Sequence, residues 1–141
     1  MLRQNGASRE KGGGLIFNAR SETALAKPMF SSSVLNRRCV VPAEKFWEWD
    51  SLKEKVEFKD PAGELMYLAG FWNIIENVAR FVVMTAAANA SVISVHDRMP
   101  LIIARSDVRR WLLDQNAFQS LMSAQMPPLV YSRQQEQLSM F

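Results

Sequence analysis

Two titratable side chains stand where this sequence could perform proton chemistry: Glu48 and the single histidine, His96. Glu48 lies between two tryptophans in F-W-E-W-D (46–50), and desolvation beside aromatic rings raises the pKa of a carboxyl toward neutrality. His96 lies in S-V-H-D-R-M-P (94–100), with an acid and a guanidinium as its next neighbours. An unperturbed imidazole already titrates near neutrality. Both groups therefore have the chemistry of general acids or bases.

Each of these residues also has a purely structural interpretation. Glu48 could face water while Trp47 or Trp49 packs into the core. A lone histidine is more often structural than catalytic. Asp97 could orient the imidazole or simply pair with Arg98. The residues alone leave these alternatives open.

Polar residues that suit anion binding follow the ends of two predicted strands. N-A-R-S-E (18–22) comes after an apolar run, and alternate residues of an extended segment share a side, so Asn18 and Arg20 could face one cleft. Thr85 ends the apolar run 80–86, where its hydroxyl could bond a phosphate or close off the strand. The plain alternative for 18–22 is a helix-capping loop with a surface arginine.

The composition is that of an ordinary globular chain. Its 141 residues are 48% hydrophobic and 22% charged, which is typical of one soluble domain with a buried core. The net charge of +3 is compatible with a polyanionic partner but does not identify one. No apolar run approaches the roughly 18 residues of a membrane span, and the N-terminus lacks the apolar region of a signal peptide. We therefore expect a cytoplasmic protein with no membrane partner.

Metal and thiol chemistry have little support in the sequence. One cysteine and one histidine make neither an internal disulfide nor a structural zinc site, so we predict no metal and no cofactor. Cys39, in the apolar run C-V-V-P (39–42), is interpreted as a small buried hydrophobe. Arg37 and Arg38 beside it would favour a thiolate, but a strand interior is a poor place for a nucleophile.

Periodicity predicts both strands and short helices. We expect strands at 15–20, 39–42, 55–60, 65–75, 80–86 and 100–103, and helices at 21–27, 30–38, 106–113 and 116–124. Ser21, one of the serines in 30–38, and Ser106 are predicted to cap the first three helices. Alternation in 55–60 and the turn P-A-G-E (61–64) predict a hairpin over 55–75.

Strands dominate the middle of the chain and helices lie near both ends, which predicts the α+β class. Residues 1–13 are polar and Gly-rich, so we expect a disordered or poorly ordered tail. Residues 14–141 then form a single domain, with a central mixed or antiparallel β-sheet and short peripheral helices.

Four motifs in a fixed order extend this interpretation. They are N-A-R-S-E-T (18–23), R-R-C-V-V-P-A-x-x-F-x-E-W (37–49), T-A-A-A (85–88) and H-D-R-M-P (96–100). None is specific alone, but together and at compatible spacing they resemble the SOS-response-associated peptidase (SRAP) family, the abasic-site processing proteins. The resemblance runs from about Leu15 to the C-terminus, so it implies a SRAP-like domain.

The resemblance also implies a function and a site. Members of this family remove their initiator methionine and bind abasic sites in single-stranded DNA, through a thiazolidine between an N-terminal cysteine and the ring-opened sugar. They therefore combine autopeptidase and DNA lyase-like chemistry in the response to DNA damage. By motif, the implied catalytic residues are Asn18, which positions the terminal amine, Glu48, which shuttles protons, and His96, which acts on the sugar oxygen. The implied DNA-binding residues are Arg20, Thr85 and Arg98.

The start of the chain departs from the family pattern. The family begins Met-Cys-Gly-Arg, whereas this sequence begins Met-Leu-Arg-Gln, so we expect an N-terminally shortened member that is impaired in covalent capture. Cys39 has no free amine and cannot replace the missing nucleophile. The alternative is a non-covalent module for single-stranded DNA, in which three tryptophans stack on bases while arginines follow the backbone. The tryptophans concerned are Trp47, Trp49 and Trp72.

Overall fold

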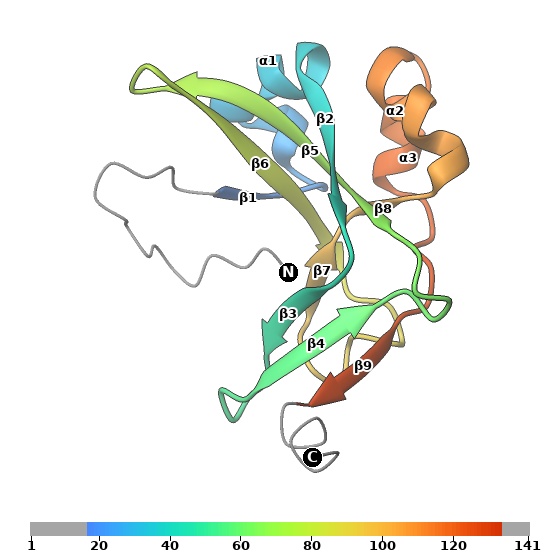
Figure 1. Ribbon diagram of the computed structural model, residues 1–141. Helices are drawn as coiled ribbons and strands as arrows, with labels where there is room; N and C mark the ends of the chain where they lie inside the picture. Colours follow the sequence, from blue (N-terminus) through green and yellow to red (C-terminus); the bar gives the residue numbers. More distant parts are fainter. Residues whose placement is uncertain (1–16, 134–141) are drawn as a thin grey trace.

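The computed structural model describes residues 17–133 (Figure 1). The predicted tail at 1–13 and the last eight residues, 134–141, lie outside this range. The strands are β1 (Phe17–Arg20), β2 (Arg38–Ala43), β3 (Phe46–Trp49), β4 (Lys55–Lys59), β5 (Met66–Ile75), β6 (Val78–Ala87), β7 (Arg98–Pro100), β8 (Ile102–Ile103) and β9 (Val130–Arg133). The helices are η1 (Ala24–Ala26), α1 (Pro28–Asn36), η2 (Arg105–Asp107), α2 (Val108–Leu113) and α3 (Phe118–Met122).

The described strands form two sheets. The larger has the order β1-β6-β5-β2, with β7 also paired to β6 and β8 to β5, and the smaller has the order β3-β4-β9. β1 runs parallel to β6, and the other pairs are antiparallel. In Figure 1 the helices lie around the upper part of the large sheet and the small sheet lies at the opposite end. The predicted α+β fold with a mixed central sheet and short helices is confirmed.

The large sheet has a hydrophobic core on each face. Successive residues of a strand point to opposite faces, so Phe71 and Val82 join the helices' core while Leu68 and Val83 join the small sheet's core. β5 and β6 approach closely at Gly70, where an added Cβ would lie 2.4 Å from the carbonyl oxygen of Val82. These two cores fix which residues of each strand can reach a functional site.

The predicted hairpin over 55–75 is wrong. β4 pairs with β3 and β9, whereas β5 pairs with β2, β6 and β8. The turn at 61–64 is present, with Gly63 in the left-handed region (φ 74°), but it leads the chain from one sheet to the other. Val56 and Phe58 are fully buried in the small sheet's core, which explains the alternation without a β5 partner.

The long hairpin of the fold is β5–β6. Its two connecting residues, Glu76 and Asn77, both have positive φ angles (53° and 63°), as a two-residue turn that matches strand twist requires. The sequence prediction missed this turn because Glu76 is an uncommon residue for a left-handed position. β9 was not predicted either, because the segment after Pro128 carries little hydrophobic alternation.

Each predicted helix has a counterpart with shifted bounds, and the predicted caps are wrong: the segment 21–27 holds only the three-residue turn η1, and α1 ends at Asn36 because Arg38 begins β2. α1 begins at Pro28, whose fixed φ suits the first helical position, and no side chain caps it. The Ser21 hydroxyl donates to the neighbouring Glu22 carboxylate instead (2.9 Å). Ser106 lies inside η2, and the helix that follows has no side-chain cap.

Arg38 of β2 fastens two helices to the sheet. Its guanidinium donates to the carbonyl oxygens of Val34 (2.9 Å) and Leu35 (3.0 Å) in the last turn of α1, and to that of Trp111 (2.5 Å) in the last turn of α2. It also lies 4.1 Å from the ring centroid of Phe118. Helix C-termini attract cations, so this buried arginine satisfies acceptors that the helices leave open.

Candidate functional site

The parallel pairing of β1 with β6 sets three of the predicted site residues on one face. Asn18 is the register partner of Val83, and Arg20 is the partner of Thr85. Paired residues share a face, so all of these point to the side of the small sheet. Asn18 and Arg20 are exposed there, and neither side chain donates or accepts a hydrogen bond within residues 17–133. The two residues share a face, as alternate residues of a strand must.

Glu48 is buried, but not by the tryptophans beside it. In β3, Phe46 and Glu48 point inward, whereas Trp47 and Trp49 point to the other side. The Glu48 carboxylate is only 1% exposed, so the alternative in which it faces water is wrong. The interior side of the small sheet, including Phe46 and the register partner Val56, removes it from water. A charge in that position requires a close polar partner.

His96 is that partner. Its Nδ1 lies 3.3 Å from the Oε2 atom of Glu48 and 3.1 Å from both the backbone nitrogen and the carbonyl oxygen of Arg98. The Asp97 carboxylate is farther, at 3.6 Å. Nδ1 accepts the backbone N–H of Arg98 in one tautomer of the ring, and in the other it can donate a hydrogen bond. The geometry therefore brings into contact the two side chains that the sequence singled out.

The other ring nitrogen of His96 is open to a ligand. Nε2 has no partner among the described residues, and the imidazole is 28% exposed. It lines an open cleft of about 660 Å³ between the β3–β4 turn and the loop before β7, together with Trp49, Asp50, Ser51, Lys53, Val95 and Asp97. Nδ1 thus meets a buried carboxylate while part of the same ring is exposed at the cleft, as a proton relay requires.

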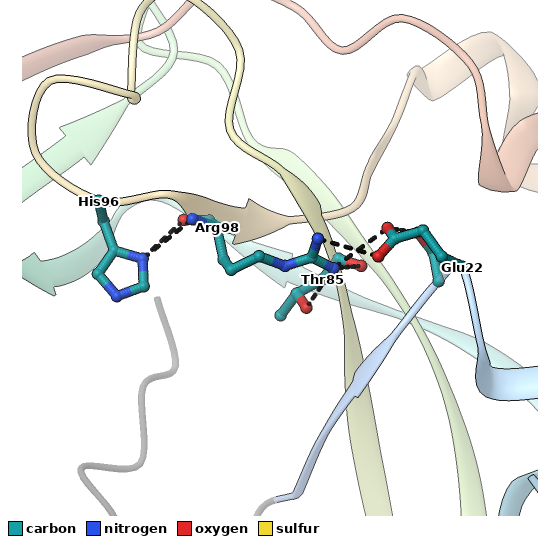
Figure 2. Close-up of polar contacts among 5 residues, drawn as sticks. Glu22, Thr85, His96 and Arg98 are labelled. Atoms are coloured by element: carbon teal, nitrogen blue, oxygen red, sulfur yellow. Dashed lines mark hydrogen bonds and ion pairs between the residues drawn. The ribbon is translucent and has the colours of Figure 1, made fainter.

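Arg98 and Thr85 form a second cluster, in which Glu22 also takes part (Figure 2). The Nη2 atom of Arg98 donates to the Thr85 carbonyl (2.9 Å) and hydroxyl oxygens (3.1 Å). The guanidinium also meets the Glu22 carboxylate with both amino groups: Nη1 lies 2.9 Å from Oε2 and Nη2 lies 3.2 Å from Oε1. Of the three, Thr85 is buried and Glu22 is the most exposed.

Glu22 is ionised in this arrangement. Burial acts to raise the pKa of its carboxyl, but the hydrogen bonds from Arg98 and Ser21 outweigh it and the net pKa lies below the ordinary value. The sequence prediction assigned Glu22 no role. Its position two residues after Arg20 was visible, but the arginine that it binds lies 76 positions away in the chain, which no local pattern reveals.

The predicted site residues thus form two clusters on one side of the large sheet. Glu48 contacts His96, and Thr85 contacts Arg98. Arg98 begins β7, and His96 lies two residues before it (Figure 2). Asn18 and Arg20 share the face, and Arg20 is the strand neighbour of Thr85. The arrangement joins a proton-carrying pair to a guanidinium that can hold an anion.

Cys39 does not belong to this site. Burial raises the pKa of its thiol to about 11, so the sulfur is neutral at ordinary pH. The neighbouring guanidinium groups do not stabilise a thiolate: Arg38 is bound to helix carbonyls, and Arg37 donates to the Trp72 carbonyl (3.0 Å) and the Ser33 hydroxyl (2.6 Å). The sequence interpretation of Cys39 as a buried small hydrophobe is correct for its neutral, unreactive thiol but not for its burial, because the residue is only half-buried.

No helix in the range 17–133 has the length and hydrophobicity to cross a membrane. The same residues contain no group of three or more His, Cys, Asp or Glu side chains placed to hold a metal ion.

The domain is of the α+β class, and its site combines a Glu–His contact with an adjacent arginine that can bind an anion. Comparison with known protein families identifies the class to which this combination belongs. The profile of the family described as SOS response associated peptidase (SRAP) matches residues 2–140. The chain therefore belongs to the SRAP family, and the resemblance inferred from four motifs is confirmed.

Curated relatives cover most of the chain. Abasic site processing protein YoqW of Bacillus subtilis is 30% identical over 131 residues, which are 86% of this chain and 58% of that protein. Abasic site processing protein YedK of Escherichia coli is 27% identical over 107 residues, 69% of this chain and 47% of that protein. Abasic site processing protein HMCES of Xenopus tropicalis is 29% identical over 123 residues, 67% and 37% respectively. The chain spans about half the length of such relatives.

Solved structures share the fold. A protein from Bacteroides thetaiotaomicron aligns with a TM-score of 0.73 at 21% identity, over 82% of this chain and 57% of that one. A protein from Bordetella bronchiseptica aligns with a TM-score of 0.74 at 22% identity, over 82% of this chain and 64% of that one. At such identity the similarity establishes the architecture alone.

Proposed function

We propose that this chain recognises abasic sites in single-stranded DNA through the cleft beside His96, and that Glu48 and His96 handle protons of the exposed sugar. The observation that carries this proposal is the contact of a buried carboxylate with the inner nitrogen of an imidazole whose outer nitrogen faces the cleft (3.3 Å between Glu48 Oε2 and His96 Nδ1). The names of the relatives, all abasic site processing proteins, support the choice of substrate.

An abasic sugar needs the chemistry that this pair supplies. Its closed form opens when the hydroxyl on C1′ loses a proton and the ring oxygen gains one, which leaves an aldehyde. His96 Nε2 can deliver or accept a proton at the sugar, and a proton exchanged between Nδ1 and Glu48 can return the imidazole to its starting state. Because Glu48 is buried, its charge stabilises the imidazolium with little screening.

Phosphates on either side of the sugar are expected to bind the arginines of the same face. Arg20 is exposed at the end of β1, and Arg98 lies on β7 beside Thr85. A guanidinium offers two parallel N–H donors that match two phosphate oxygens. Asn18, on the same face as Arg20, is proposed to position an amine next to the sugar.

Covalent capture is a separate step. A thiazolidine requires an amine and a thiol on one terminal residue, and both condense with the aldehyde to release water. The second residue of this sequence is Leu2 and the single cysteine is Cys39, whose thiol is half-buried and neutral. We propose that a polypeptide of residues 1–141 alone binds and opens the abasic sugar without forming this crosslink, and that the same polypeptide with a Met-Cys-Gly-Arg start forms it.

The test compares three single-stranded DNA oligonucleotides and two N-terminal sequences of the protein. Fluorescence anisotropy would measure binding to single strands that carry an abasic site, a reduced abasic analogue or no lesion, and a denaturing gel would detect crosslinks. We expect preference for the lesion with either start, but a crosslink only from the chain that begins Met-Cys-Gly-Arg. Glu48→Gln should slow that crosslink by about 100-fold, with the exposed Gln119→Ala as control. Equal binding to all strands, with no crosslink, would contradict the proposal.

The second candidate is a lesion-independent binder of single-stranded DNA. Trp72 is 41% exposed, and the Arg37 guanidinium lies 5.6 Å from its ring centroid, an arrangement that suits base stacking. Trp47 instead has the Lys55 ammonium at 4.3 Å and that of Lys45 at 5.4 Å from its ring. Affinity that falls steeply with salt and ignores the lesion would favour this candidate.

A further inference from the structure

The Arg98 guanidinium already holds an anion of its own chain. Its two amino groups face the two carboxylate oxygens of Glu22 at 2.9 and 3.2 Å (Figure 2). This is the two-point geometry in which an arginine grips a phosphate. The pair is electrically neutral overall, so Arg98 exerts little net attraction on DNA while Glu22 stays in place.

The remaining N–H donors of Arg98 are not accessible to a phosphate from solvent. Nη2 is also bonded to the Thr85 carbonyl and hydroxyl oxygens, and Nε is buried, with no partner among the described residues. The Arg98 side chain is 16% exposed, whereas that of Glu22 is 49% exposed. A phosphate that approaches from solvent therefore meets the Glu22 carboxylate before it meets the guanidinium.

Glu22 can leave without disturbing the fold. Its half-exposed carboxylate can be hydrated when it loses Arg98, and Ser21 still offers a hydroxyl donor at 2.9 Å. The two Thr85 contacts would keep the guanidinium in position. Glu22 also lines an open cleft of about 470 Å³ with Leu25, Ala87 and Met122, so there is space beside it.

We propose that Glu22 is an exchangeable counter-ion of Arg98. Its carboxylate binds the Arg98 guanidinium while no DNA is bound, and a DNA phosphate replaces the carboxylate on binding. This inference rests on the proposed function, because it assigns the displacing anion to the DNA backbone. Glu22 would thereby act as a positioning and selectivity residue. Only an anion that binds Arg98 more strongly than the carboxylate does would displace Glu22, so small monovalent anions would not bind there.

The test is the affinity of an unmodified and an abasic single strand for Glu22→Gln, measured by anisotropy from 50 to 300 mM salt. Glu76→Gln is the matched control, since it also removes one negative charge, from a side chain that is 85% exposed and 3.9 Å from Arg80. We expect Glu22→Gln to tighten binding about fivefold and to steepen the salt dependence by about 0.7 in the log–log slope. Glu76→Gln should change affinity less than about twofold.

A double substitution links the effect to Arg98. In the Arg98→Met background, Glu22→Gln should leave the affinity unchanged, because the two residues act through one contact. Thermal unfolding would verify that each variant is folded. Weaker binding by Glu22→Gln, or a gain no larger than that of Glu76→Gln, would overturn the inference.

The outcomes separate the two proposals. Lesion preference together with equal effects of Glu22→Gln and Glu76→Gln would leave the proposed function intact and refute the exchange. A specific gain from Glu22→Gln on both strands without lesion preference would support the exchange and refute recognition of abasic sites. Absence of DNA binding by every variant at 50 mM salt would overturn both.

Discussion

Two largely buried arginines of this fold, Arg38 and Arg98, differ in the groups that accept their hydrogen bonds. Arg38 donates to the carbonyl oxygens of Val34, Leu35 and Trp111 at the ends of two helices, and it meets no carboxylate within hydrogen-bonding distance among the described residues. Arg98 donates to Thr85 and to the carboxylate of Glu22, which is half exposed. One guanidinium is held by neutral groups of the fold, and the other by an anion near the surface.

The difference separates a structural arginine from a binding arginine. Backbone carbonyls cannot be displaced, so the Arg38 guanidinium is not available to a ligand. Burial lowers the pKa of this guanidinium, and the Asp114 carboxylate opposes that shift. A surface carboxylate can be exchanged for another anion at small cost, because exposed ion pairs contribute little to stability. The chemistry of the acceptors, rather than burial alone, marks Arg98 as available for function.

The largest expected effect is on the stability that Arg38 provides. Arg38→Met removes three hydrogen bonds to buried carbonyl oxygens and the contact with the Phe118 ring. We expect a loss of about 3 kcal/mol in the free energy of unfolding, measured in urea. Arg38→Lys should recover only part of it, since an ammonium lacks the fork. A loss below about 1 kcal/mol would remove the contrast between the two arginines.

Arg98→Met should cost less stability and more binding. The Thr85 carbonyl retains the backbone N–H of Ser21 at 2.8 Å, and Glu22 becomes hydrated, so we expect a loss of about 1 kcal/mol in urea unfolding. Affinity for single-stranded DNA should fall about tenfold, with a shallower salt dependence. Equal losses of stability in the two methionine variants would contradict this prediction.

Acid should affect the Arg98 pair and spare the Arg38 contacts. The pKa of Glu22 lies below its ordinary value in the folded chain, so its contribution to stability is present above about pH 4.3 and is lost as pH falls through the lowered pKa. Glu22→Gln should therefore reduce the acid-induced shift of the urea midpoint between pH 6 and pH 3.5. Carbonyl acceptors do not titrate and Asp114 acts on Arg38 only through its charge, so Arg38→Met should change that shift less than Glu22→Gln does.

The smallest expected effect concerns Cys39, which follows Arg38 in the chain. Burial raises the pKa of the Cys39 thiol to about 11, so a disulfide reagent at pH 8 should modify folded protein far more slowly than protein in urea. Stability should decline as pH rises from about 8.5 toward 11, because the unfolded thiol ionises first; Cys39→Ala should remove this part of the decline. Fast labelling of the folded chain would indicate that the charge of Arg38 reaches the sulfur.

Local patterns predicted the positions of elements better than their partners. The apolar runs at 39–42, 65–75 and 80–86 all became strands, because side-chain periodicity depends on nearby residues. The alternation of 55–60 was real, but it reports that one side is buried and not which strand lies next to it. Pairing is decided by contacts far along the sequence, and β4 found β3 and β9 instead of β5.

The same limit applied to the site. The motifs identified Glu48 and His96, and the structure brings the two together; that contact joins residues 48 positions apart, so it could not be read from either motif alone. One of the two interpretations of Glu48 attributed its desolvation to Trp47 and Trp49, yet those rings point to the other side of β3. Glu22 remained without a role for a similar reason, since its partner comes from β7.

The parallel pairing of β1 with β6 has a consequence for how the cleft is assembled. β1 joins Phe17–Arg20 to partners 65 residues later in the chain, which is a long loop to close before any contact repays the entropy. β5 and β6, by contrast, are joined by a two-residue turn and can pair early. The strand that carries Asn18 and Arg20 is thus expected to be the last part of the large sheet to fold, so these two side chains reach their positions only after β5 and β6 have paired.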